Sequence, residues 1–149
     1  MSEATSENST VFSAMVLVMG IVALILPFAF RVDVGPGPDS IRAMTWDYIE
    51  SSWYSGFRIW NPLETLPYTF LRLVFALYLA RLCVGHATSR RTILIGILAE
   101  LQPFAVSAPL VYFIDWSGDP LIPLYIPLPI MFIFGFTLIL IFTRRNKND

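Results

Sequence analysis

The chain has 149 residues, of which 56% are hydrophobic and 14% are charged. A soluble globular domain typically carries about 25% charged residues because its surface faces water, so this composition excludes an ordinary soluble domain and indicates an integral membrane protein. The 10 Lys and Arg residues and the 11 Asp and Glu residues give a formal net charge of -1, which excludes the broad basic surface of a nucleic-acid-binding protein.

The chain contains one cysteine, Cys83, and one histidine, His86. A single cysteine cannot form an intramolecular disulfide, a CxxC redox pair or a thiolate metal site. A Cys and a His three residues apart also lack the third group that would orient a catalytic base. We therefore predict no catalytic residues, no metal site, no cofactor and no enzymatic activity.

Residues 1–10 form a polar tail, which we predict to be disordered. The apolar run at 11–30 is long enough to cross about 30 Å of hydrocarbon as a helix, and it is longer than the apolar core of a signal peptide. Further apolar runs lie at 66–84, 92–114 and 121–142, and a basic, polar tail fills 143–149. We therefore predict an all-α fold, a single membrane domain over 11–142 with four transmembrane helices in a four-helix bundle.

Between the first two runs, a turn region rich in Gly and Pro precedes a stretch at 40–60 for which we predict an amphipathic helix. At about 100° per residue, its aromatic side chains Trp46, Trp53, Phe57 and Trp60 fall in one sector. Such a face suits the membrane interface, where an indole can be half buried. The alternative is that the face docks a partner protein.

Two ionisable residues lie deep in the predicted spans, Arg72 in the second and Glu100 in the third. Such residues usually face the interior of a bundle, and Glu100 shares a helical face with Gly96, Pro103 and Ser107. The short connection between the two helices makes them antiparallel neighbours, so we expect an Arg72–Glu100 ion pair. Two interpretations stay open: the pair only fixes the helix register, or it forms part of a proton or cation site.

Prolines crowd the start of the fourth apolar run, at Pro120, Pro123, Pro127 and Pro129. Proline removes a backbone donor and is tolerated only in the first turn of a helix. We therefore expect the regular helix to start near 127–129, after a kinked or extended segment.

Positive residues predict the orientation, because short flanks rich in Lys and Arg stay in the cytoplasm. Such flanks follow the second and fourth runs, whereas the acidic loop at 115–120 has no positive residue. This distribution predicts a multi-pass protein of the cell membrane with both termini cytoplasmic. The positive residues of the two flanks are Arg90, Arg91, Arg144, Arg145 and Lys147.

The stretches NPLETLPYTFLRLVFALYLARL and TSRRTILIGILAELQ resemble a pattern found in small four-span membrane proteins of archaea that have no assigned function. The resemblance covers roughly 60–115 and carries no catalytic motif. It implies an archaeal cell membrane.

These observations favour a non-enzymatic structural or accessory subunit, with membrane lipid or a larger membrane protein as its partner and no nucleic acid. The alternative is a small transporter or ion conductor that uses Glu100 and Arg72; it would be a homo-oligomer, because four short spans enclose too little volume for a pathway. A third possibility is an enzyme acting on lipid, for which the clustered outer acids are Glu64, Asp115 and Asp119.

Overall fold

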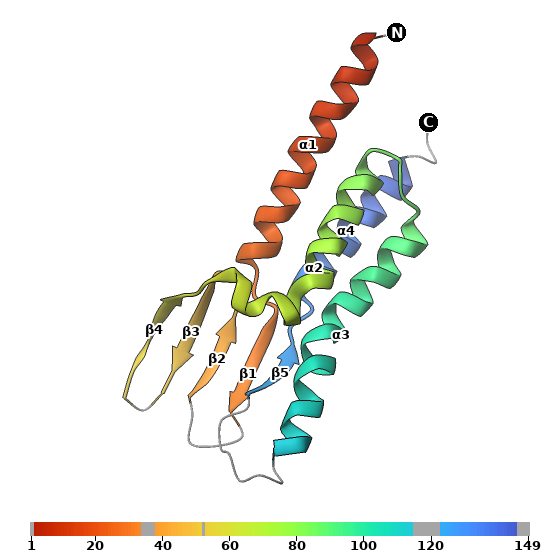
Figure 1. Cartoon of the computed structure of the whole chain (residues 1–149). Helices are drawn as coiled ribbons and strands as arrows, with labels where there is room; N and C mark the ends of the chain where they lie inside the picture. The colour runs from red at the N-terminus through yellow and green to blue at the C-terminus, as the bar shows by residue number, and fades with distance from the viewer. Residues whose placement is uncertain (1, 34–37, 52, 115–122, 146–149) are drawn as a thin grey trace.

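The computed structural model describes residues 2–33, 38–51, 53–114 and 123–145. These residues form four helices and five strands (Figure 1). In chain order the elements are α1 (Ser2–Ile25), β1 (Ala29–Asp33), β2 (Asp39–Arg42), β3 (Trp46–Glu50), β4 (Ser55–Ile59), α2 (Pro62–Cys83), α3 (Ser89–Ile114), β5 (Pro123–Pro127) and α4 (Ile130–Arg145).

The strands form one antiparallel sheet in the order β4-β3-β2-β1-β5. β1 to β4 follow one another as neighbours, and β5 comes from the far end of the chain to pair with β1, with Phe30 opposite Ile126. The all-α fold class predicted from the sequence is therefore wrong, and the chain is not a bundle of helices alone.

The predicted interfacial helix at 40–60 is also wrong, because this stretch forms β2, β3 and β4. Ile41 lies opposite Tyr48, and Tyr48 lies opposite Phe57, so β-branched and aromatic side chains line up across three strands. Such cross-strand pairs stabilise a sheet. The turn after β3 is held by the Ser51 hydroxyl, which accepts a hydrogen bond from the Tyr54 amide at 2.9 Å. Pairing between neighbouring strands thus overrides the helical spacing of the aromatic residues.

The four aromatic residues expected on one face are consequently separated. Trp46 and Phe57 still touch, with ring centroids 5.5 Å apart. Trp53 is 95% exposed beyond the end of β3, whereas the Trp60 ring lies against two arginines. No common aromatic face remains.

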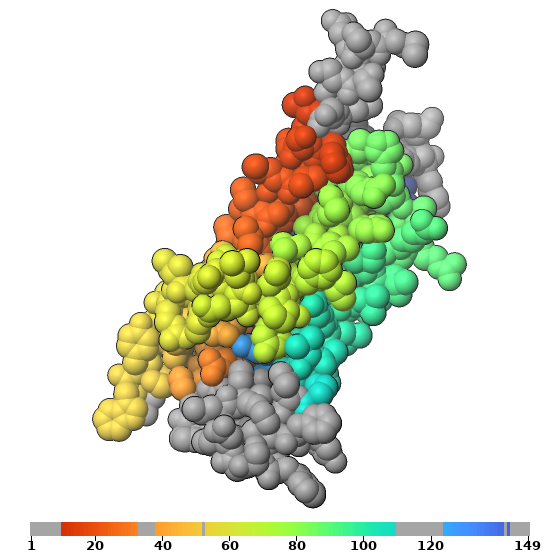
Figure 2. Space-filling view, in the orientation of Figure 1, coloured from red at the N-terminus to blue at the C-terminus, as the bar shows by residue number. Residues whose placement is uncertain are grey.

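The helices extend from one end of the sheet (Figure 1). α2 and α3 pack as an antiparallel hairpin, α1 packs against α2, and α4 packs against both helices of the hairpin. The half of α3 nearer its C-terminus continues beside the sheet and covers β5. In the space-filling view α2 lies across the front of the junction between α1, the sheet and α3 (Figure 2).

The core between the helices is centred on the fully buried Phe75 of α2. Its ring fits there because two neighbouring helices carry glycine at the contact. A β-carbon on Gly96 would lie 2.8 Å from Phe75 Cε2, and one on Gly135 would lie 2.6 Å from Phe75 Cζ. Both distances are too short for a real contact, so each glycine permits the close approach of its helix.

Two helices in the described part of the chain are long and apolar enough to cross a membrane, namely α2 and the first 21 residues of α3. The apolar parts of α1 and α4, Thr10–Ile25 and Ile130–Ile141, are shorter. The prediction of four transmembrane helices is therefore wrong. The first predicted span ends inside β1, and the last one begins before β5, which uses the apolar residues at 123–127 as a strand.

Candidate functional site: polar side chains between the helices and the sheet

The C-terminal end of α1 meets the sheet and exposes carbonyl groups that no further turn of helix can satisfy. Side chains from the segment between β2 and β3 and from β3 itself satisfy two of them. Thr45 Oγ1 donates to the Leu24 carbonyl at 3.1 Å, and Trp46 Nε1 donates to the Ile25 carbonyl at 2.9 Å. Trp46, expected at a lipid interface, instead anchors the sheet to this helix.

Arg72 of α2 satisfies the next two carbonyls of the same segment. Its Nη2 donates to Leu26 O at 3.0 Å and to Pro27 O at 3.2 Å. The side chain is buried, with 3% of its surface exposed. A cation at a helix C-terminus is favourable because the helix dipole is negative there. Arg72 therefore acts as a cap that joins α1 to α2.

Glu100 of α3 caps a different helix. Its Oε1 accepts a hydrogen bond from the Phe132 amide at 3.0 Å, and Phe132 is the third residue of α4. The segment before α4 was expected to be kinked or extended, and it is the extended strand β5 followed by Leu128 and Pro129. A carboxylate at the exposed amides of a helix N-terminus is favourable for the dipole and for hydrogen bonding.

The structure does not bring Arg72 and Glu100 into the expected ion pair. Neither side chain has a partner of opposite charge within 4.0 Å among the described residues. Each instead binds main-chain groups, at the end of α1 or at the start of α4. The two charges attract each other only through space.

Gln102 of α3 enters the hydrogen-bond ladder of α2. The Leu71 amide donates to Gln102 Oε1 at 2.8 Å, and Gln102 Nε2 donates to the Pro67 carbonyl at 2.7 Å. The side-chain amide thus bridges the two main-chain groups that a regular α-helix would join directly. Helices bend where a side chain is inserted in this way, and α2 changes direction in its first half (Figure 1).

The remaining predicted members of the Glu100 face are all buried and serve packing. Gly96 admits the rings of Phe75 and Phe132, and Pro103 is fully buried. Ser107 is 1% exposed and its hydroxyl accepts a hydrogen bond from the Tyr125 amide at 3.1 Å. This bond ties β5 to α3.

A second polar cluster lies on the sheet and was not predicted. Arg42 Nη1 donates to the Tyr125 hydroxyl at 2.6 Å, and Arg42 Nη2 lies 3.2 Å from Asp47 Oδ2. Arg58 Nε lies 3.7 Å from the other Asp47 oxygen. The two guanidinium carbons lie 4.4 Å and 4.0 Å from the centroid of the Trp60 ring. The cluster holds one negative and two positive groups, and it joins β2, β3, β4 and β5.

The environment of Tyr125 shifts its acidity. Burial raises the pKa of the phenol above its usual value of 10.0, whereas the charges of Arg42 and Arg31 oppose this shift. Tyr68 packs beside it, with ring centroids 4.7 Å apart. The hydroxyl is therefore held protonated as a partner for Arg42.

Sequence reasoning missed Gln102 and the Arg42 cluster for different reasons. Gln102 has a local signal, a polar amide inside an apolar run opposite a helix that contains Pro67. The cluster has none, because Tyr125 comes from a strand whose pairing is invisible in the sequence. Of the outer acids, Glu64 is exposed in the first turn of α2, whereas Asp115 and Asp119 lie outside the described residues.

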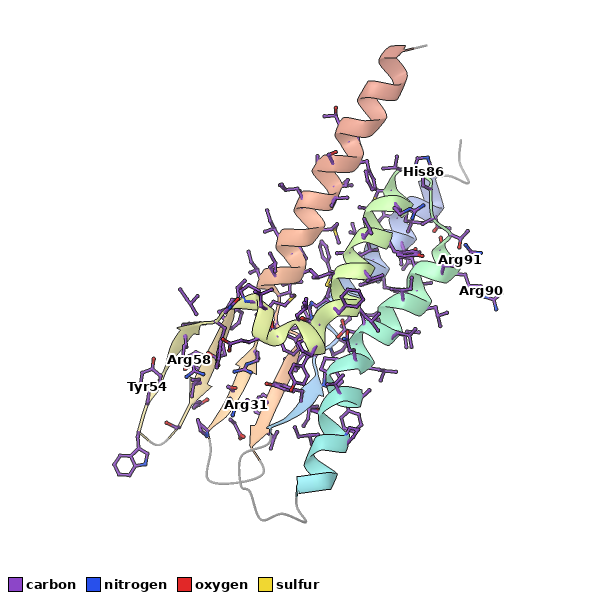
Figure 3. All side chains as sticks on the ribbon, in the orientation of Figure 1. Arg31, Tyr54, Arg58, His86, Arg90 and Arg91 are labelled. Atoms are coloured by element: carbon purple, nitrogen blue, oxygen red, sulfur yellow. The ribbon has the colours of Figure 1, made fainter. Side chains whose placement is uncertain are left out.

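Figure 3 places Arg58 and Arg31 at the sheet and His86, Arg90 and Arg91 at the opposite end of the helices. Within the described ranges, no group of three His, Cys, Asp or Glu side chains could hold a metal ion. No protein-family model, curated protein or solved structure matches the chain.

Proposed function

We propose that the chain is a non-enzymatic integral membrane protein that acts as an accessory subunit, with the hairpin of α2 and α3 in lipid and its sheet outside the bilayer. The apolar surface of the helices is the observation that supports their insertion in a membrane. Soluble monomers rarely expose contiguous apolar patches of more than a few hundred Å². Here, large apolar side chains are exposed on every helix. They include Leu17 and Ile21 on α1, Phe70 and Leu77 on α2, Leu98 and Leu101 on α3, and Ile133 and Ile141 on α4.

The hairpin of α2 and α3 fits a bilayer better than the core of a soluble protein. A core helix is mostly buried, whereas 33% of the apolar window in α2 and 28% of that in α3 are buried. Their 22 and 21 residues span about 31–33 Å at 1.5 Å per residue, close to the hydrocarbon thickness of about 30 Å. This hairpin is the membrane-crossing unit of the proposal.

The same arrangement supports an orientation. The turn between α2 and α3 lies at the end of the helices remote from the sheet, and so do the start of α1 and the end of α4 (Figure 1). The basic residues Arg90 and Arg91 lie there too. By the positive-inside rule, this end of the hairpin is cytoplasmic, and the sheet is on the outer side of the membrane that α2 and α3 cross.

The accessory role is supported by the free edge of the sheet. Within the described residues β4 has a partner strand on one side only, whereas the other edge strand, β5, is covered by α3. β4 carries Phe57, which is 71% exposed, and Ile59, which is 88% exposed. Proteins usually shield a sheet edge of this kind, and a strand of a larger membrane protein could add to it.

The positions of Arg72 and Glu100 favour this role over transport. A transport site needs groups that are available to a substrate or proton. Both side chains are instead engaged by main-chain groups that hold α1 and α4 in place.

The proposal predicts that the chain stays in the membrane pellet after alkaline carbonate extraction. A photo-crosslinking residue at Phe57 should then give one stoichiometric product with a second protein, and the same residue at Tyr48, on the neighbouring strand, should give much less. Release of the chain by carbonate would contradict the membrane part. A crosslinked product that contains only this chain would contradict the role of β4. Equal yields of crosslinked product from Phe57 and Tyr48 would contradict it as well.

A further inference from the structure

A cavity of about 350 Å³ lies where α2 ends and α3 begins. It lies at the end of the helices remote from the sheet and is separate from the polar side chains between the helices and the sheet. Its polar lining comes from Tyr78 and Arg81 of α2, His86 and Thr88 of the connecting turn, and Arg91 of α3.

The basic side chains of this cavity have no carboxylate beside them in the part of the chain that the structure describes. Arg81, His86 and Arg91 are all exposed, and no carboxylate is within 4.0 Å of any of them among the described residues. The sequence has no Asp or Glu between Glu64 and Glu100. Within the described residues, the positive charge of this end of the hairpin is therefore not offset by an ion pair.

The turn that shapes the cavity is fixed by backbone hydrogen bonds. The Gly85 amide donates to the Leu82 carbonyl at 3.0 Å, and the His86 amide donates to the Arg81 carbonyl at 2.8 Å. Gly85 has a φ of 78°, the left-handed conformation that completes a Schellman motif. The turn thus holds His86 next to the last turn of α2 in a defined position.

The N-terminus of α3 adds to the positive potential. The first amides of α3 point toward the cavity end of that helix, where a helix N-terminus favours an anion. Ser89, the first residue of α3, is held there by its side chain, whose Oγ lies 3.0 Å from Thr143 Oγ1 of α4. A dianionic group bound here would face Arg81, Arg91 and this helix end.

We propose that this cavity binds a phosphate monoester group, held by Arg81 and Arg91, with the head group of an anionic lipid as its source in the membrane. Guanidinium groups bind phosphate oxygens through strong, charge-assisted hydrogen bonds. In the orientation proposed above, the cavity lies at the level of the cytoplasmic head groups. Binding itself does not depend on the accessory role, because it can be measured on the solubilised chain.

The test uses the full chain in a non-ionic detergent and native mass spectrometry with three probes. These are phosphatidic acid, which carries a phosphate monoester, phosphatidylcholine, which does not, and inorganic phosphate. Arg81→Gln and Arg91→Gln should each weaken phosphatidic acid binding by about tenfold or more, since a hydrogen bond to a charged group is worth at least one factor of ten. The matched control is Arg90→Gln, which removes the same charge beside the cavity but not from its lining.

The outcomes are distinct. Selective loss in the Arg81 and Arg91 variants, with Arg90→Gln within about twofold of the wild type, supports the proposal. If inorganic phosphate shows the same dependence on Arg81 and Arg91 and displaces the lipid, a free phosphate compound is the source. An equal loss of affinity for phosphatidic acid in all three variants would mean that the lipid is attracted to the basic surface in general, and it would overturn the proposal. It would also be overturned if phosphatidic acid bound no better than phosphatidylcholine and inorganic phosphate did not bind.

Discussion

Replacing Glu100 tests whether its carboxylate stabilises the start of α4. Glu100→Ala removes the acceptor of the Phe132 amide, and an N–H left without a partner costs about 1–3 kcal/mol. It also removes a negative charge near a helix N-terminus, which is worth about 0.3–1 kcal/mol. Glu100→Gln keeps an acceptor oxygen and loses only the charge. The Ala variant should therefore lose about 1.3–4 kcal/mol and the Gln variant about 0.3–1 kcal/mol.

Thermal unfolding in detergent, followed by tryptophan fluorescence, measures the difference. For a chain of this size 1 kcal/mol corresponds to about 2–4 °C in Tm, so Glu100→Ala should lower the Tm several degrees more than Glu100→Gln. Hydrogen exchange should show faster exchange at Phe132 in the Ala variant and unchanged exchange in the last turns of α4. Glu50→Gln, at an exposed position at the end of β3, is the control and should change the Tm little. Equal losses for Ala and Gln, or unchanged exchange at Phe132, would refute the reasoning.

Three further variants test other contacts. Gly135→Ala places a β-carbon 2.6 Å from Phe75 Cζ and should lower the free energy of unfolding by about 1–3 kcal/mol through overpacking. The loss should be smaller when Phe75 is also replaced by Leu. An equal loss in that background would show that the strain does not come from the Phe75 ring. Tyr125→Phe leaves Arg42 Nη1 unpaired and should lower the Tm at pH 7. Because burial raises the pKa of Tyr125, its stabilisation is present below pH 10.0 and is lost as the pH rises through the folded pKa, so the Tm gap between the variant and the wild type should narrow in alkali. Gln102→Leu removes two hydrogen bonds to α2 and should lower the free energy of unfolding by about 1–3 kcal/mol. It should also alter the hydrogen exchange of the α2 amides. Exchange identical to that of the wild type would show that Gln102 is not inserted between main-chain groups of α2.

The hairpin of α2 and α3 could be predicted because its signals are local. Both helices lie in long apolar runs, and the predicted spans at 66–84 and 92–114 overlap them almost completely. The start of α2 has its own signal, since Asn61 precedes a proline and its side chain accepts a hydrogen bond from the Leu63 amide at 3.1 Å. Such capping depends only on neighbouring residues.

The place of β5 in the sheet could not be predicted because its pairing with β1 is long-range. β1 lies at the end of an apolar run that reads as a continuous helix, and its partner β5 comes about a hundred residues later. Pro27 was the one local sign that α1 ends early, since a helix usually stops before a proline. The other strands pair with their neighbours in the sequence, but the helical spacing of their aromatic residues hid this pattern.

The candidate site was predictable in part. Helical periodicity places Arg72 and Glu100 on inward faces, where their side chains lie in contact with other elements of the chain. Their hydrogen-bond partners could not be inferred, because each side chain binds main-chain groups at the end of a helix, and that end was predicted at the wrong residue. A pairing argument based only on side-chain charge overlooks such caps.

Spin labels test most directly whether the helical hairpin lies in lipid and the sheet in water. With Cys83 replaced by Ser, single labels at Leu77 of α2, Leu98 of α3 and Ile59 of β4 report on exposed positions of each part. In liposomes, labels at Leu77 and Leu98 should be relaxed by oxygen and protected from a water-soluble nickel chelate. The label at Ile59 should show the reverse. Access of the nickel chelate to all three positions would contradict a membrane-embedded hairpin.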